Sequence, residues 1–187
     1  VAVGPYSVSN YAMEAKKNQE IAMENSKQVI LEVAEKYREL TGRGFDLFEE
    51  YRTEDADYIM LIMGSAAGTA KQAVDELRER GKKAGVLKLR VFRPFPADEI
   101  AQALKNCKAA ALMDRCESYN GNGGPLGSEV PAALFRNKIM IETVNYIYGL
   151  AGRDFTVRDV MGIFGELEDM IEKGASVEQY QYIRLRK

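Results

Sequence analysis

The stretch Leu112–Glu129, LMDRCESYNGNGGPLGSE, decides the fold class of this sequence of 187 residues. An apolar run over 109–113 leads into the charged residues Asp114 and Arg115, and a glycine-containing loop and helix-like sequence follow. This order is typical of a strand that ends at the carboxyl edge of an α/β sheet. Ligands and partners meet such folds beyond these strand ends, so the stretch is also the first candidate for a functional site.

Gly121, Gly123 and Gly124 give this loop its character. Glycine permits positive φ angles and close approach of the backbone, and successive N–H groups in such a loop can cradle an anion. The alternative is a turn that only carries the chain over the sheet edge. Asp114 and Arg115 also leave two alternatives open: a local ion pair that shapes the loop, or a contact with another subunit.

Upstream of this stretch, the run Tyr58–Met63 (YIMLIM) is fully apolar, as a strand buried on both faces requires. The small residues of 64–69 (GSAAGT) follow it, and an amphipathic helix then continues to Gly81. Strand, glycine-containing turn and helix form the first half of a βαβ unit. The turn lacks the GxGxxG and GxxxxGK[ST] patterns, so the sequence signal for a nucleotide site is weak here. The alternative is tight packing of the strand and helix through small residues.

The segment 84–91 (AGVLKLRV) predicts the next strand, which Pro94 and Pro96 end before a helix with two acidic residues in its first turn. Arg93 therefore lies at a strand end. Its guanidinium can bind a carboxylate or a phosphate there. Alternatively, it can hold the turn by donating to backbone carbonyl groups.

Downstream of the glycine loop, residues 129–135 predict a helix. We expect it to begin near Ser128, because Pro131 then falls in the first turn, whereas a helix beginning at Pro125 would contain a kink. Residues 139–144 (IMIETV) predict a strand, and a turn region is expected after it.

The C-terminal part contains that turn region, 146–154 (YIYGLAGRD), and one more helix. Thr156 begins the helix with a capping-box pattern, and Gly174 ends it. The polar and basic tail 175–187 is predicted to be an extended or partly ordered exit.

The N-terminal part has helical periodicity over 12–41, with Gly42 as the residue that ends the helix, and 45–51 (FDLFEEY) predicts a short edge strand. Strands and helices then alternate along the chain. This alternation predicts an α/β fold, a three-layer α/β/α sandwich with a mostly parallel sheet, preceded by a long N-terminal helix. We divide the chain into a linker segment, 1–44, and an α/β domain, 45–187.

Composition excludes several classes of function. A net charge of −2 with 46% apolar residues makes neither nucleic acid nor an anionic membrane the expected partner. No apolar run approaches the roughly 20 residues of a membrane span, and no leader pattern is present. Cys107 and Cys116 are too few and too far apart for a metal cluster or a CxxC pair, and no disulfide framework is evident, which favours the cytoplasm. The chain has no histidine, which excludes His-dependent triads and His-based zinc sites within it.

Three segments together carry a resemblance to a known family: 49–96 with its RPFP ending, 111–130 with the Asp-Arg pair and the glycine loop, and 148–156 with GLAGRD. They resemble the alpha subunit of the 2-oxoacid:ferredoxin oxidoreductases, above all the pyruvate:ferredoxin oxidoreductase (pyruvate synthase) family. The resemblance extends from about residue 11 to about residue 174. It implies that 45–187 is the family's second domain, which is similar to the C-terminal domain of transketolase. Residues 1–44 would then be the link from a preceding pyrimidine-binding domain.

The resemblance also implies an activity. The whole enzyme oxidatively decarboxylates pyruvate on thiamine diphosphate with Mg²⁺, passes electrons through iron–sulfur clusters to ferredoxin, and forms acetyl-CoA, or catalyses the reverse reaction. The cofactor-binding domains would lie on other domains or subunits, which would also be the partners of this chain. By itself this segment is expected to be inactive, a structural and assembly domain without catalytic residues, cofactor or metal of its own.

One set of residues is the candidate contact with another subunit or with coenzyme A: Arg93, Asp114, Arg115, Gly121, Gly123 and Gly124. Two other functions remain as alternatives. One is a stand-alone Rossmann-like nucleotide-binding module that uses 64–68. The other is the equivalent domain of another thiamine diphosphate enzyme, such as a transketolase.

Overall fold

The computed structural model describes residues 11–119 and 121–186. The chain divides into two compact units. One unit contains helix α2 (Ala12–Thr41), the residues after it as far as Leu47, and Val91–Phe95; the other contains Phe48–Arg90 and Pro96–Lys187. Residues 1–10, which belong to the predicted linker segment, lie outside the described residues.

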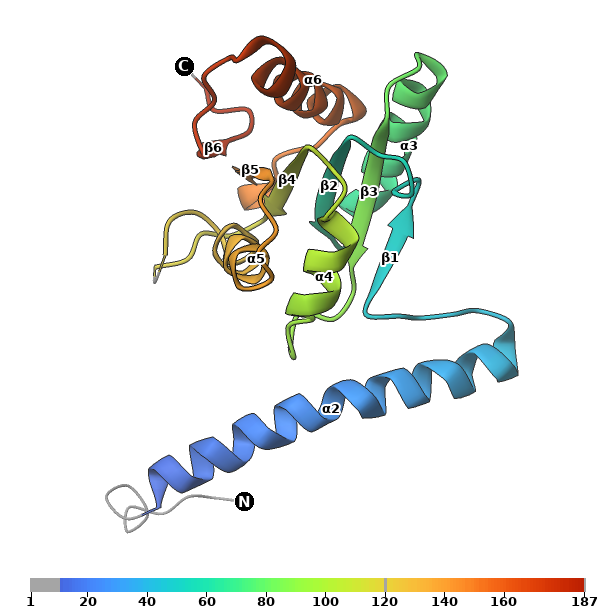
Figure 1. The fold of residues 1–187 in the computed structure, drawn as a ribbon, viewed down its shortest axis with the longest axis vertical. Coiled ribbons are helices and arrows are strands. Elements are labelled where there is room, and N and C mark those ends of the chain that lie inside the picture. The colour runs from blue at the N-terminus through green and yellow to red at the C-terminus, as the bar shows by residue number, and fades with distance from the viewer. Residues whose placement is uncertain (1–10, 120, 187) are drawn as a thin grey trace. The chain divides into compact units, whose positions relative to one another are not determined.

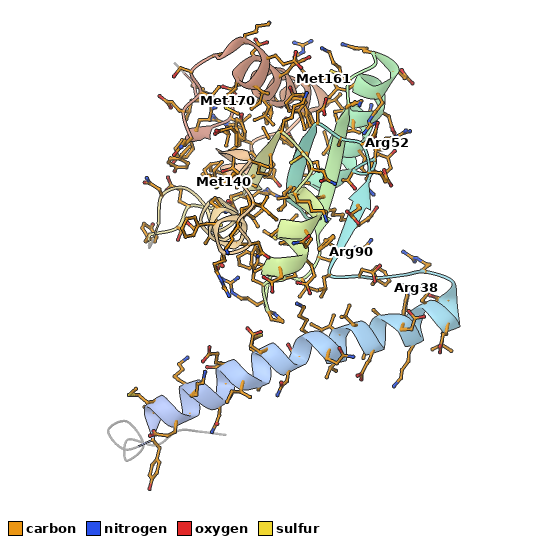
Figure 2. All side chains as sticks on the ribbon, in the orientation of Figure 1. Arg38, Arg52, Arg90, Met140, Met161 and Met170 are labelled. Atoms are coloured by element: carbon orange, nitrogen blue, oxygen red, sulfur yellow. The ribbon has the colours of Figure 1, made fainter. Side chains whose placement is uncertain are left out.

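The first unit is built on α2, whose predicted bounds are confirmed. Gly42 ends the helix in the left-handed conformation, with φ 70°, and donates its N–H to the carbonyl of Arg38. The Arg38 side chain, labelled in Figure 2, also forms an ion pair with Asp46 at 3.2 Å. Ala34 is the one buried residue of the helix. Within the described residues, this helix is thus defined by its own sequence and by the Gly42 cap at its end rather than by burial.

The second unit contains a six-stranded sheet in the order β1-β3-β2-β4-β5-β6. Its strands are β1 (Phe48–Tyr51), β2 (Tyr58–Met63), β3 (Ala84–Leu89), β4 (Ala109–Asp114), β5 (Glu142–Ile147) and β6 (Tyr180–Tyr182). Edge strand β1 is antiparallel to β3, and all other pairs are parallel. The mostly parallel sheet predicted from the sequence is thus confirmed.

Helices cover both faces of this sheet, which gives the predicted three layers (Figure 1). Helix α3 (Ala66–Glu79) packs with α6 (Val157–Lys173), and α4 (Ala97–Leu104) packs with α5 (Pro125–Arg136). Parallel neighbours need crossover connections, and helices that return over the sheet supply them. The sheet is therefore buried on both faces, as its apolar strands require.

Strand β2 shows how the two cores form. Met60 and Ile62 pack in the core beneath α3 and α6, whereas Ile59 and Leu61 point to the opposite face, and all four are at most 1% exposed. Successive residues of a strand alternate between faces, so one apolar run serves both cores. Burial of each such side chain contributes about 1.5–3 kcal/mol. Met161 and Met170 of α6 pack against the first core while partly exposed (Figure 2).

Two local predictions were wrong, and a third, that of the tail, was incomplete. Helix α5 begins at Pro125, not near Ser128, and it contains Pro131. Strand β5 begins at Glu142, which pairs with Ala109 of β4. The apolar residues 139–141, predicted as strand, therefore lie outside β5. Tyr146, predicted as turn, lies within the strand. The tail contributes the short strand β6, which pairs with β5. In each case a partner distant in the sequence sets the boundary.

Candidate functional site

The carboxyl edge of the sheet has a topological switch point between β2 and β4. From β2 the chain crosses to β3 on one side, and β4 then lies on the other side of β2. The loops that leave the carboxyl ends of β2 and β4 therefore run in opposite directions and open a crevice between them. Such crevices are the usual ligand sites of open α/β sheets.

A cavity of about 410 Å³ lies at this crevice. Three loops line it: the turn after β2, the start of the loop after β4, and the segment after β5. The polar side chains of its lining are Ser65, Thr69, Arg115, Tyr148, Arg153 and Asp154. Its volume lies within the range of small-molecule sites, about 300–1,000 Å³.

Asp114, the last residue of β4, lies on the side of the sheet that faces α5 and is 1% exposed. Its carboxylate accepts hydrogen bonds from the backbone N–H groups of Leu126 (3.2 Å) and Gly127 (3.1 Å). It also accepts one from the side-chain N–H of Asn145 (2.9 Å). Burial raises the pKa of Asp114 above its ordinary value, and these three hydrogen bonds oppose the rise.

The predicted anion cradle is therefore filled by the protein's own carboxylate. The first N–H groups of a helix have no partner within the helix and carry partial positive charge. In α5, two of these groups bind Asp114, which explains why the helix can begin at Pro125. The loop does more than carry the chain over the sheet edge, because it fastens α5 to the end of β4.

Asn145 of β5 completes this arrangement, and sequence reasoning missed it. Its side-chain oxygen accepts from the N–H of Gly124 (2.8 Å), and its amide group donates to the carbonyl of Leu112 (2.8 Å). The signal was present in the sequence, as a single amide residue inside the apolar run VNYI. We call Asp114, Asn145 and the N–H groups that they bind the strand-end lock.

The glycines of the loop are required by close approach to the strand-end lock. A Cβ atom at Gly124 would lie 2.3 Å from the Asp114 side chain, and one at Gly123 would lie 2.2 Å from the Asn145 side-chain oxygen. Gly123 also has φ 81°, which L side chains rarely adopt. At Gly121 a Cβ would lie 2.6 Å from the Ser128 hydroxyl. Gly124 thus packs against Asp114 and Gly123 against Asn145, whereas Gly121 packs against Ser128, which is not part of the strand-end lock.

Arg115 takes a different direction from Asp114, because successive residues at a strand end point to opposite sides. It donates to the carbonyl of Gly149 (3.2 Å), and its guanidinium lies 5.9 Å from the ring centre of Tyr148. Each member of the predicted pair thus has its own partners, and the alternative of a local ion pair between them does not hold. Arg115 is exposed and lines the cavity.

Arg93 belongs to the other unit, the one that contains α2. Its guanidinium lies 4.2 Å from the ring centre of Phe92 and donates to the Phe92 carbonyl (3.0 Å). A bond to a backbone carbonyl is the contact that the turn-holding alternative requires. The peptide bond between Arg93 and Pro94 is cis.

The cysteines do not have the surroundings of reactive thiols. Cys107 is buried, which raises the pKa of its thiol to about 12, and the pKa of exposed Cys116 is raised by partial burial and by Asp114. Iron–sulfur clusters are commonly held by four cysteine thiolates, and the sequence has two cysteines. Over residues 11–119 and 121–186, no group of three or more potential metal ligands is found, nor a helix that is long and apolar enough to cross a membrane.

Two solved structures share this architecture. A split-gene transketolase, an inactive β4 tetramer, matches 69% of this chain and 44% of its own with a TM-score of 0.53. The 2-oxoglutarate:ferredoxin oxidoreductase from Magnetococcus marinus matches 66% of this chain and 20% of its own with a TM-score of 0.52. Both are 19% identical in sequence, so the likeness concerns the fold. The fold of the α/β part of the chain is thus similar to that of transketolase, as predicted.

Sequence comparison then gives the family. Residues 56–160 match the family described as pyruvate:ferredoxin oxidoreductase core domain II, and the chain belongs to this family. Pyruvate synthase subunit PorA of Thermotoga maritima is 37% identical over 187 residues, which are 100% of this chain and 47% of that protein. Ketoisovalerate oxidoreductase subunit VorA of Pyrococcus abyssi is 36% identical over 188 residues, with the same coverage of 100% and 47%. The chain therefore spans about half the length of the curated relatives it matches.

Proposed function

We propose that this chain is the core-domain-II part of the alpha subunit of a 2-oxoacid:ferredoxin oxidoreductase. The whole enzyme would oxidatively decarboxylate pyruvate to acetyl-CoA and CO₂ while it reduces ferredoxin, or catalyse the reverse reaction. The observation that carries this proposal is the family match over 56–160, which includes both the glycine loop and the GLAGRD segment. The match also favours this function over a stand-alone nucleotide-binding module.

Within that enzyme, the chain would act through structure and assembly. The iron–sulfur clusters would be bound by other domains or subunits, because two cysteines cannot supply the ligands of such clusters. Thiamine diphosphate and Mg²⁺ would also be bound outside this chain. Residues 1–44 would form the link from a preceding domain. Met23, Val33 and Leu40 of α2 are 40%, 58% and 85% exposed, which supports a helix that is covered by other parts of the assembly.

Of the candidate residues, Arg115 and Arg93 would mainly make the proposed contact with another subunit or with coenzyme A. Asp114 and the loop glycines are already engaged in the strand-end lock, whereas Arg115 is exposed at the cavity. The relatives named for pyruvate and for ketoisovalerate are nearly equally identical to this chain, at 37% and 36%. We therefore place the choice of 2-oxo acid outside this region.

Anaerobic purification of the full-length protein with its partners tests the assignment. Dye reduction with methyl viologen is measured in the presence of coenzyme A, thiamine diphosphate and either pyruvate or ketoisovalerate. Co-purifying iron–sulfur subunits and 2-oxo-acid-dependent dye reduction are expected. A colourless protein that purifies alone and reduces no dye with either acid would refute the proposal.

The role of Arg115 is tested by Arg115→Ala, with Arg158→Ala on the exposed surface of α6 as the matched control. A contact made with another subunit predicts a nearly unchanged melting temperature of the chain and a reduced yield of co-purified subunits. A large fall in melting temperature in Arg115→Ala alone would show that this side chain stabilises the domain instead.

A further inference from the structure

The glycine loop contains a dipeptide whose chemistry the strand-end lock does not use. Asn122 precedes Gly123 in this loop and is exposed. Residues 121–124 lie in neither a helix nor a strand, so no regular hydrogen-bond ladder holds the backbone there. When glycine follows an asparagine, its backbone nitrogen readily attacks the asparagine side chain, because glycine has no side chain to hinder the approach.

The backbone nitrogen of Gly123 is available for this attack. The Gly123 carbonyl accepts from the N–H of Ser118 at 2.8 Å. The next N–H, that of Gly124, donates to the side-chain oxygen of Asn145 at 2.8 Å. Within the part of the chain that the structure describes, the N–H of Gly123 itself has no hydrogen-bond acceptor. The chain is thus fixed beyond the nitrogen that would react, whereas this nitrogen is not engaged.

The other asparagines that the structure describes lack this combination, since none of them precedes a glycine. They are Asn18 and Asn25 in α2, Asn106 after α4, Asn137 after α5 and Asn145 in β5. Asn106 is exposed, as Asn122 is. The residue after Asn106 is Cys107, whose N–H donates to the carbonyl of Leu104 at 3.1 Å. Asn106 is therefore the matched comparison within the same chain.

We propose that Asn122 is a site of covalent modification at which the chain reacts with itself to form a succinimide. The Gly123 nitrogen loses its proton and bonds to the side-chain carbonyl carbon of Asn122. The bond from that carbon to the amide nitrogen breaks, and ammonia leaves with the proton. Water then opens the ring: attack at the main-chain carbonyl gives isoaspartate, and attack at the side-chain carbonyl gives aspartate. No electrons are transferred, and water is the one added reactant.

The two products differ in their effect on the strand-end lock. In isoaspartate the main chain runs through the side-chain carbon, which lengthens it by one carbon–carbon bond, about 1.5 Å. Gly123 and Gly124 have little room to shift, because an added Cβ would lie 2.2 Å and 2.3 Å, respectively, from side-chain atoms of the strand-end lock. The longer chain therefore displaces the Gly124 N–H from Asn145 and weakens the start of α5. Aspartate keeps the ordinary main chain, and its charge near the N-terminus of α5 is favourable.

Peptide mapping of the full-length chain after incubation at mildly alkaline pH tests the reaction. An endoproteinase specific for glutamate releases Asn122 in the peptide 118–129. The same digestion releases Asn106 in the peptide 100–117. Fragmentation by electron transfer locates each conversion and distinguishes isoaspartate from aspartate.

We expect Asn122 to be converted at least about tenfold faster than Asn106 in the same sample. Conversion should also be faster at alkaline than at neutral pH, because the nitrogen must lose its proton to react. Conversion of Asn122 no faster than that of Asn106, or conversion confined to Asn120, which also precedes a glycine, would overturn the proposal. The redox activity plays no part in this measurement, so the proposal and the proposed function can fail separately.

Two variants, both made in an Asn120→Gln background, test the effect on the strand-end lock. Asn122→Gln keeps an amide but would have to form a larger ring, which closes more slowly. Asn122→Asp supplies the aspartate product directly and carries the same added charge as the converted chain, which anion exchange separates from the unconverted chain.

The converted chain should melt at least about 5 °C below the unconverted chain, whereas Asn122→Asp and incubated Asn122→Gln should stay within about 2 °C of it. A converted chain that contains isoaspartate and melts with Asn122→Asp would refute the effect on the strand-end lock. An equal fall in incubated Asn122→Gln would refute Asn122 as its source.

Discussion

Removal of the Asp114 carboxylate is the most direct test of the strand-end lock. In Asp114→Ala, the N–H groups of Leu126 and Gly127 and the amide of Asn145 lose their acceptor, which lies 3.2, 3.1 and 2.9 Å away in wild type. Each buried donor left without a partner costs about 1–3 kcal/mol. The variant no longer buries a carboxylate, which offsets part of that cost, so we expect a net loss of about 2–4 kcal/mol in the free energy of unfolding.

Urea unfolding followed by circular dichroism measures this loss, and thermal unfolding should show a fall of about 5–15 °C. Asp98→Ala is the control, because Asp98 is exposed and makes one hydrogen bond, with the Asn137 side chain at 3.0 Å. It should cost less than about 1 kcal/mol. A loss in Asp114→Ala no larger than in Asp98→Ala would refute the reasoning that this carboxylate holds the start of α5.

Three further substitutions test other contacts. Gly124→Ala would place a Cβ 2.3 Å from the Asp114 side chain, so we expect a loss of about 2 kcal/mol or more in urea unfolding. The pKa of Glu49 is lowered, first by its hydrogen bond to Lys71. The charged Glu49 carboxylate therefore stabilises the folded chain at pH values above its ordinary pKa, and this stabilisation is lost as the pH falls through the lowered pKa. On acidification below about pH 4.5, the stability of Glu49→Gln should therefore fall less than that of wild type. Thr156→Ala breaks the capping box of α6 and should cost about 1 kcal/mol in thermal unfolding.

Each of these substitutions has a control variant. Gly68→Ala lies in α3, where an added Cβ meets no atom within 4 Å, and it should not destabilise. Glu50→Gln alters an exposed carboxylate of the same strand and should keep the acid sensitivity of wild type. Thr156→Ser keeps the capping hydroxyl. Equal behaviour within any pair would contradict the contact assigned to its first member.

Local patterns were sufficient for most of the fold. The apolar run 58–63, the helix over 12–41 and the capping box at Thr156 each depend on residues that are near one another in the sequence. Their period and end signals are therefore complete in a short window. The order of these elements then indicated the layered α/β class, which the observed sheet confirms.

The features that sequence reasoning missed depend on distant partners. The start of α5 is held by Asp114 and Asn145, which lie on two different strands, and no local pattern contains both. Strand β6 is short and polar and exists through its pairing with β5. The glycine loop was selected from the sequence as a candidate contact, but the packing of Gly123 and Gly124 against the strand-end lock required the geometry. Arg153 lines cavities that exist only in the folded chain, so no local sequence pattern pointed to this residue.

The two edges of the sheet limit how this domain can associate with other chains. Unpaired strand edges are templates for strand addition and aggregation unless they are short or charged. On one edge, β1 has four residues with two consecutive glutamates, and Glu49 is held by Lys71 and Arg90; on the other, β6 has three residues. Neither is a long, flat, uncharged template. Addition of a further strand at either edge of the described sheet is thereby discouraged, which leaves the helices and loops of the domain as the surfaces better suited to contacts with other chains.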